Sequence, residues 1–311
     1  MGDIVTYKNG NYTVTRITYK NGNYTVMLNL NDGSKMRFND LDNLTPDHAE
    51  SIDVTISTYC EAGCAFCYAG CSKNGKHADI MSPSFIVNLP PYTELALNGN
   101  EPLHPDLVPF LEKCKSLKLV PSITVNQTTF MKNIDLLKQL SDDRLIYGLG
   151  VSLTNPSYEF IENVKEFPNA VIHVVNGIVN MCQLHALRDK GLKILVLGYK
   201  KVGRGVGYYG YNSLRVEVEM AALYNNLENI INDNWFDVVS FDNLALEQLE
   251  VKHLMSEDEY RRFYMGDDGK FSMYIDMVSK KFYKNSLMAD GGHELLDDPK
   301  EMFDIIRNES K

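Results

Sequence analysis

The sequence predicts an α/β fold: a largely parallel sheet preceded by a small antiparallel β domain. From residue 51 to about residue 250, apolar strand-like runs alternate with amphipathic helical stretches, the pattern of parallel strands joined by crossover helices. Before this region, Asn-Gly turns separate short strand-like runs, which is the strongest short-range signal for hairpins. We therefore divide the chain into a β domain (1–45), an α/β core (50–250) and a C-terminal α/β extension (251–311).

Residues 1–45 are expected to form a meander of four or five strands that resembles a small SH3-like or KOW-like barrel. Residues 6–14 recur without change as residues 18–26, and each copy places Asn-Gly between strand-forming residues. A third turn is expected at residues 31–34. Such a module could bind a peptide, RNA or protein partner, or it could be a cap packed on the core.

Seven strands and five main helices are expected in the core. The strands are placed near residues 52–57, 94–98, 120–126, 145–152, 170–176, 193–198 and 236–241. The helices are placed at residues 106–117, 132–140, 158–167, 179–190 and 216–231, where apolar side chains recur at helical spacing. Three prolines in residues 77–92 predict that the first crossover helix is short or irregular.

The C-terminal extension leaves this alternation. A helix over residues 256–262 is expected, with Ser256 as its cap and acidic residues in its first turn. A hairpin should follow, formed by residues 271–278 and 281–284, and a polar helix should close the chain.

Composition and charge limit the classes of function. The chain has 311 residues, 44% of them hydrophobic, and a net charge of −10. This charge argues against bulk nucleic-acid binding, which favours a basic surface. No apolar run reaches the roughly 20 residues that span a bilayer, and the N-terminus lacks the form of a signal peptide. We expect a cytoplasmic protein with no membrane partner.

A loop with three cysteines follows the first core strand. Cys60, Cys64 and Cys67 have C-x3-C-x2-C spacing, and three thiolates on one loop can bind three irons of a [4Fe-4S] cluster. The fourth iron is then open to a small molecule. Zinc is the alternative, but structural zinc usually takes four ligands in paired C-x2-C units, and the sequence has no second pair. Cys71 could be a fourth ligand that closes the cluster, or a buried small residue.

A second motif, at residues 99–102, ends the second core strand. Backbone carbonyls at a strand end, together with the carboxylate of Glu101, can accept hydrogen bonds from an ammonium group. Gly99 allows close approach of the backbone, and Asn100 tolerates a left-handed conformation. The alternative is an ordinary strand-to-helix turn, with Pro102 in the first helical turn.

These two motifs resemble those of the radical S-adenosylmethionine (radical SAM) enzymes. Phe66, just before the third cysteine, is typical of the family, and residues 99–102 are similar to its Gly-Gly-Glu-Pro element, with Asn100 replacing the second glycine. The resemblance implies a partial (β/α)6 barrel with one [4Fe-4S] cluster whose open iron binds S-adenosylmethionine (AdoMet). An electron from a flavodoxin- or ferredoxin-like donor would then cleave AdoMet to a 5'-deoxyadenosyl radical.

The resemblance also implies further AdoMet contacts at the ends of later strands. Ser152 and Asn155 follow the fourth strand, where the family places polar groups on the ribose or carboxylate. Asn176 ends the fifth strand, where relatives contact adenine. Arg204 lies in a Gly-Arg-Gly stretch after the sixth strand and could bind the AdoMet carboxylate with two nitrogens. The alternative for Ser152 and Asn155 is a plain turn without a ligand. The alternative for Arg204 is a solvated side chain in a flexible loop.

Substrate contacts are expected on the loops at the carboxyl ends of the strands. The Gly- and Tyr-rich stretch 206–211 is interpreted as a mobile loop that faces substrate, and Asp242 and Asn243 lie near the same rim. An ordinary surface loop is the alternative for the tyrosine-rich stretch.

The C-terminal extension resembles the SPASM domain of peptide-modifying relatives but lacks the cysteines that bind auxiliary clusters. Its hairpin leads to Asn285-Ser286, and no cysteine follows Cys182. With the N-terminal β domain, this favours a peptide or protein substrate, and a nucleoside or another small molecule is the alternative. A different class is a non-catalytic iron-sulfur or zinc protein completed by Cys71. The sequence does not indicate which residues are catalytic.

Overall fold

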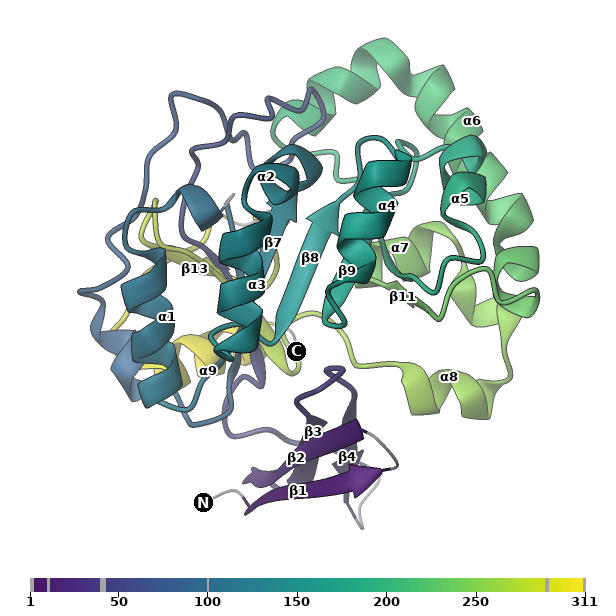
Figure 1. Cartoon of the computed structure of the whole chain (residues 1–311). Helices are drawn as coiled ribbons and strands as arrows, with labels where there is room; N and C mark the ends of the chain where they lie inside the picture. Colours follow the sequence, from purple (N-terminus) through teal and green to yellow (C-terminus); the bar gives the residue numbers. More distant parts are fainter. Residues whose placement is uncertain (1–2, 10–11, 40–42, 100, 289–290, 310–311) are drawn as a thin grey trace.

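The chain folds into two sheets with helices packed on the larger one (Figure 1). The computed structural model describes residues 3–9, 12–39, 43–99, 101–288 and 291–309. In this part of the chain no helix combines the length and apolar character needed to cross a membrane.

The N-terminal sheet is a four-stranded antiparallel meander, in agreement with the hairpin signals. Its strands, in spatial order, are β1 (Asp3–Asn9), β2 (Tyr12–Asn21), β3 (Tyr24–Asn29) and β4 (Lys35–Phe38). At the turn between β2 and β3, Gly22 has φ +61°, and a Cβ there would lie 1.9 Å from the Thr45 carbonyl oxygen. Glycine is therefore required at this turn.

The large sheet has ten strands and contains all seven predicted core strands, with ends shifted by a few residues. In chain order they are β5 (Ser51–Thr55), β6 (Glu94–Asn98), β7 (Val120–Asn126), β8 (Gly148–Ser152), β9 (Ala170–Val175), β10 (Lys193–Leu197) and β11 (Val238–Phe241). These strands are parallel and adjacent in sequence order. Beyond β5, the sheet continues with β12 (Ser272–Asp276), β13 (Lys281–Tyr283) and β14 (His293–Glu294), of which only β12 is parallel to its core neighbour.

The helices follow the predicted order, with differences at α2 and at α9. They are η1 (Ser84–Asn88), η2 (Glu101–Leu103), α1 (Leu107–Ser116), α2 (Gln127–Lys132), α3 (Ile134–Asp142), α4 (Tyr158–Lys165), α5 (Met181–Leu187), α6 (Arg204–Asn232), α7 (Asn243–Gln248), η3 (Val251–Leu254), α8 (Glu257–Phe263) and α9 (Pro299–Glu309). The predicted helix 132–140 corresponds to α3, and the separate helix α2 before it was not predicted. The short helix η1 confirms the irregular first crossover. The closing helix α9 is amphipathic, because Met302, Phe303 and Ile306 are fully buried.

The tyrosine-rich stretch 206–211 is helical, so its interpretation as a mobile loop is wrong. It forms the first turns of α6, which begins at Arg204 and bends at Asn212, where the backbone leaves helical geometry. Aromatic packing holds these turns, since the Tyr209 ring lies 6.0 Å from that of Tyr199. Tertiary contacts outweigh the low helix propensity of glycine here.

The two faces of the parallel sheet differ in chemistry. Side chains such as Ile52, Val54 and Val151 are fully buried, and α1, α3 and α4 lie over the sheet (Figure 1). Alternate residues point the other way because strand side chains have a period of two. This second face carries small and polar residues, including Asp53 and His173, and lines a cavity of about 460 Å³. We call it the inner cavity.

The sheet curves, so that its two ends approach one another. Asn243, just after β11, donates through Nδ2 to Asp268 Oδ1 at 2.6 Å, although Asp268 lies just before β12. Asn285, after β13, donates to the other oxygen of Asp268 at 2.7 Å. We call Asn243, Asp268 and Asn285 the polar bridge, and it spans the open side of the curved sheet.

The N-terminal sheet packs beneath the amino ends of the core strands, far from their arrowheads (Figure 1). Its apolar contact joins Tyr24 and Val26 to Tyr92 and Phe271 of the core. This position supports the interpretation of the β domain as a cap on the core.

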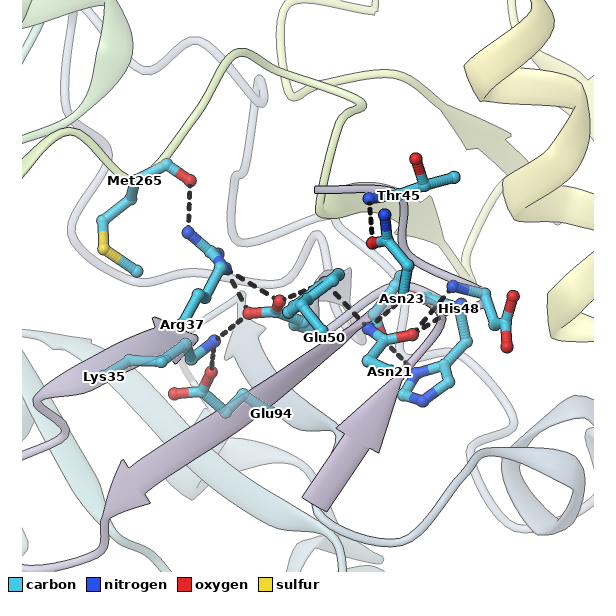
Figure 2. A network of polar contacts seen from close by, with 12 residues as sticks. Asn21, Asn23, Lys35, Arg37, Thr45, His48, Glu50, Glu94 and Met265 are labelled. Atoms are coloured by element: carbon cyan, nitrogen blue, oxygen red, sulfur yellow. Dashed lines mark hydrogen bonds and ion pairs between the residues drawn. The ribbon is translucent and has the colours of Figure 1, made fainter. Parts of the chain in front are cut away.

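A buried ionic network holds this cap in place (Figure 2). Glu50, which is fully buried just before β5, accepts hydrogen bonds from Arg37 at 2.8 and 2.9 Å and pairs with Lys35 at 3.0 Å. The Tyr24 hydroxyl also donates to it at 2.5 Å, and Lys35 pairs with Glu94 of β6 as well. Although burial acts to raise the pKa of Glu50, the contacts with Arg37 and Lys35 lower it below its ordinary value.

Glu50→Gln should lower the free energy of unfolding by about 3 kcal/mol at pH 7, because it leaves buried cations without their shared partner. Since the stabilising charge of Glu50 is lost on acidification through its lowered pKa, the difference from wild type should shrink below pH 4. Denaturant unfolding at several pH values measures both effects.

The matched control is Glu162→Gln, which breaks an exposed pair with Lys165 and should change stability little. If Glu50→Gln changed the free energy of unfolding as little as this control, the network would not be what holds the cap on the core.

Candidate functional site

The cysteine loop lies directly after β5 and folds back on itself through backbone hydrogen bonds. The Cys60 amide donates to Ser72 O at 2.9 Å, and the Cys67 amide donates to Cys64 O at 3.2 Å. Gly63 and Gly70 have positive φ, which suits the tight turns on either side of Cys67. The three predicted cluster cysteines thus share one compact loop at the carboxyl end of the sheet.

The thiols of the loop influence one another. Burial raises the pKa of Cys64, and the nearby charges of Cys67 and Cys60 raise it further. A hydrogen bond with the buried Cys71 lowers the pKa of Cys67 below its ordinary value. Within the described ranges, no three His, Cys, Asp or Glu side chains surround a common metal position. The donor set suits a three-thiolate site, with Cys67 turned toward Cys71 in this conformation.

Arg204 holds the loop from the start of α6. Its Nε and Nη2 donate to Cys64 O at 3.1 and 2.9 Å, Nη2 also reaches Cys71 O at 2.7 Å, and Nη1 reaches Gly70 O at 3.0 Å. Its backbone amide donates to Cys67 O at 3.1 Å. The structure therefore places Arg204 on the loop carbonyls, and its contact with an AdoMet carboxylate remains a prediction.

The glycine before Arg204 makes this contact possible. Gly203 has φ +55°, and a Cβ there would lie 2.0 Å from the Tyr68 carbonyl oxygen. The backbone of this segment can approach the cysteine loop only without a side chain at this position.

The second motif lies beside the strand that leads into the cysteine loop. Thr55 of β5 is in register with Asn98 of β6, and the Ile56 amide donates to Asn98 O at 3.1 Å. Gly99 has φ +119°, and a Cβ there would lie 2.1 Å from Ser57 O. The sheet therefore brings the start of this motif next to the cysteine loop. The predicted contacts of Asn100 and of the Glu101 side chain lie outside the described residues.

The predicted contacts at the ends of β8 and β9 have different surroundings. Ser152 is partly buried, and Asn155 is exposed in a loop held by Gln127, whose Oε1 accepts from the Asn155 amide at 2.8 Å. Asn176 is fully buried and donates to Gln248 of α7 at 3.1 Å. Asn176 thus ties β9 to α7, and its contact with adenine remains a prediction.

Two residues near the loop were not singled out from the sequence. Asn126 ends β7, accepts from the Thr129 amide as the cap of α2, and places Nδ2 3.9 Å from Cys60 Sγ. Its position at a strand end before a helix is the signal that could have identified it. The Tyr208 ring on α6 packs edge-on at 5.9 Å against the predicted Phe66, which positions the far side of the loop.

The inner cavity contains charged groups that lie below the cysteine loop. Asp53 is surrounded by protein yet open to the cavity, and burial raises its pKa to about 6. Burial lowers the pKa of Lys200, whose Nζ donates to Ser286 Oγ at 2.6 Å and lies 4.2 Å from the centroid of the Tyr68 ring. His173 is neutral near pH 7, because burial lowers its pKa to about 4.

Asp242 also lines the cavity, but its side chain is engaged. Its Oδ1 accepts from the amides of Ala245 and Gly198, both at 2.8 Å, so it caps α7 and fixes the end of β10. In the structure Asp242 therefore makes hydrogen bonds to nearby backbone amides. That Asp242 and Asn243 bind substrate stays a prediction.

Asp53→Asn should stabilise the protein more at pH 8 than at pH 4. The pKa of Asp53 rises on folding, so the folded state binds more protons and the cost of its buried charge appears as the pH rises through about 6. The facing charges are Lys200, which opposes this effect, and Asp268 and Asp242, which add to it. Differential scanning calorimetry of both proteins at several pH values measures it, and a difference in Tm that does not change with pH would contradict it.

Comparisons with known proteins support the fold. The structure is similar to that of SuiB from Streptococcus suis bound to S-adenosylmethionine, with a TM-score of 0.60 and 11% sequence identity over 93% of this chain and 86% of that one. A second SuiB structure gives a TM-score of 0.57 and 12% identity over 94% and 86% of the two chains. No protein-family model matches the sequence, and no curated protein matches it. At this level of identity the likeness concerns the fold.

Proposed function

We propose that this protein is a radical SAM enzyme with a single [4Fe-4S] cluster held by Cys60, Cys64 and Cys67. The observation that carries the proposal is the compact three-cysteine loop at the carboxyl end of a curved parallel sheet, beside the Gly99 motif. Its fold is similar to that of SuiB, a protein whose structure is bound to AdoMet. The cluster, when bound, supplies the electron that cleaves AdoMet to methionine and a 5'-deoxyadenosyl radical.

The residues of the chain position this chemistry. Arg204 fixes the backbone of the loop that carries the three cysteines, through hydrogen bonds to the carbonyls of Cys64 and Cys71. Cys67, which shares a hydrogen bond with Cys71, would give up that contact to bind the cluster. Gly99 exposes the backbone at the end of β6, where the AdoMet ammonium group is proposed to bind.

The inner cavity is proposed to hold the group from which hydrogen is abstracted, and the curvature of the sheet supports a partial (β/α)6 barrel. We propose a peptide or protein substrate, on the basis of the SPASM-like extension. A flavodoxin- or ferredoxin-like donor would reduce the cluster in the cytoplasm.

A second candidate is a non-catalytic metal protein in which Cys71 is the fourth ligand. The hydrogen bond between Cys71 and Cys67 favours it, because it shows that the two thiols are within reach of each other. In that case no metal position would remain open to AdoMet.

Anaerobically reconstituted protein should release 5'-deoxyadenosine from AdoMet after reduction with dithionite. Replacing Cys60, Cys64 or Cys67 with alanine should reduce release to background, because each removes a thiolate that holds the cluster. Cys71→Ala should retain it, as should the control Cys182→Ala at an exposed site. Chromatography of the quenched reaction measures the product. No release by the wild type, or release only after Cys71→Ala opens the fourth position, would favour the second candidate.

Arg204→Lys should lower the iron and sulfide bound per chain several-fold after reconstitution. Lysine keeps the charge but has one nitrogen in place of the planar guanidinium, whose three nitrogens reach the carbonyls of Cys64, Gly70 and Cys71, so the loop loses its fixed shape. The matched control is Arg215→Lys, at an exposed position of the same helix. Equal iron content in both variants would show that the loop does not depend on this guanidinium.

A further inference from the structure

A second hollow lies against the outer side of the polar bridge. This outer groove has a volume of about 500 Å³ and is lined by Glu247, Glu250, Asp267, Tyr260 and Tyr264, among others. Asn243, Asp268, Lys284 and Asn285 line both the outer groove and the inner cavity. The bridge residues and one lysine therefore separate the two hollows.

This partition consists of side chains rather than paired backbone. In the sheet that the structure describes, β11 is an edge strand and does not pair with β12 or β13. Two of the contacts across the gap join amide groups to the Asp268 carboxylate, and Asn243 also donates to Gly266 O at 3.2 Å. A cationic guest can replace a neutral amide at a carboxylate, because a hydrogen bond between charged partners is stronger than one to a neutral donor.

The outer wall of the groove is weakly attached to the rest of the protein. Helix α8, which carries Tyr260, has no buried residue along its length. Phe263 at its end is 72% exposed. A segment with so little buried surface opens at low cost in free energy, so this side of the molecule can widen without unfolding the core.

The charges along the route favour a cation. Six carboxylates line the two hollows together: Glu247, Glu250, Asp267, Asp268, Asp53 and Asp242. Three lysines face them: Lys200, Lys252 and Lys284.

Asp53, at the inner end of the route, is the carboxylate best placed to receive a ligand. Asp268 and Asp242 accept hydrogen bonds from the protein, whereas Asp53 accepts none from the part of the chain that is described. Desolvation penalises its charge and Lys200 offsets that penalty only in part, since the pKa of Asp53 is still raised, so a cation brought by a ligand would offset it further.

We propose that the open side of the sheet is the substrate entrance, and that it admits an aliphatic side chain with a primary ammonium or guanidinium group to Asp53. The stacked rings of Tyr260 and Tyr264, 5.1 Å apart, offer a surface for the chain behind the cation. The inner cavity, at about 460 Å³, accommodates such a side chain. The inference deepens the proposed function by naming its substrate class.

Binding of two nearly isosteric probes tests the cation site. N-acetyl-lysine methylamide should bind the reconstituted full-length protein at least tenfold more tightly than N-acetyl-norleucine methylamide at pH 7.5, measured by isothermal titration calorimetry. Asp53→Asn should abolish this preference, and Glu162→Gln on α4 should retain it. The preference should also decrease below pH 6, as Asp53 becomes protonated. Equal binding of the two probes, or a preference that survives Asp53→Asn, would overturn the proposal.

Association kinetics test the route. Reversing two charges of the outer groove, in Glu247→Lys with Asp267→Lys, should slow association of the lysine probe about tenfold at low salt and change its dissociation little. An unchanged association rate would show that the cation enters elsewhere.

Cleavage of AdoMet by the same wild-type preparation separates the two proposals. Cleavage without a preference for lysine would contradict the cation site alone. A lysine preference in a protein that never cleaves AdoMet would contradict the proposed reaction and support the cation site.

Discussion

The alternation of side chains along the parallel strands is the constraint on which the rest of the structure depends. Parallel sheets are usually apolar on both faces, because helices cover both. Here one face is apolar beneath the helices, and the other carries Asp53, Ser122, Gly148 and His173. Such a face is unsuited to a second layer of helices. The sheet curves around it instead, and the enclosed space is a cavity that can hold water and ligand.

The curved sheet has two ends with separate roles. The carboxyl ends of β5 and β6 bring the cysteine loop beside the second motif, and Arg204 joins that loop to α6. The amino ends are closed by the N-terminal sheet, whose buried ionic network is centred on Glu50. Removing the cap would leave Glu50 without Lys35 and Arg37, so a truncated chain would not be a neutral background for studying the site.

The open side differs from both ends, because no pairing between described strands closes it. The Asn243–Asp268–Asn285 bridge joins residues that follow β11 to residues that flank β12 and β13. The C-terminal extension thus completes the wall of the inner cavity. This arrangement gives the extension a role in shaping the cavity, whatever its relation to SPASM domains.

The sequence by itself determined where the core strands lie along the chain, the Ser256 cap and the position of the cysteine loop, because these follow from local periodicity, turn chemistry and spacing. Only the tertiary structure decided where Arg204 points, that residues 206–211 are helical, and that Asp53 faces a cavity. Each of these depends on contacts between segments far apart in the chain: Arg204 meets carbonyls of the cysteine loop, and Asp53 shares its cavity with Asp268. Local sequence patterns carry no information about such pairs, because the curvature of the sheet brings them together.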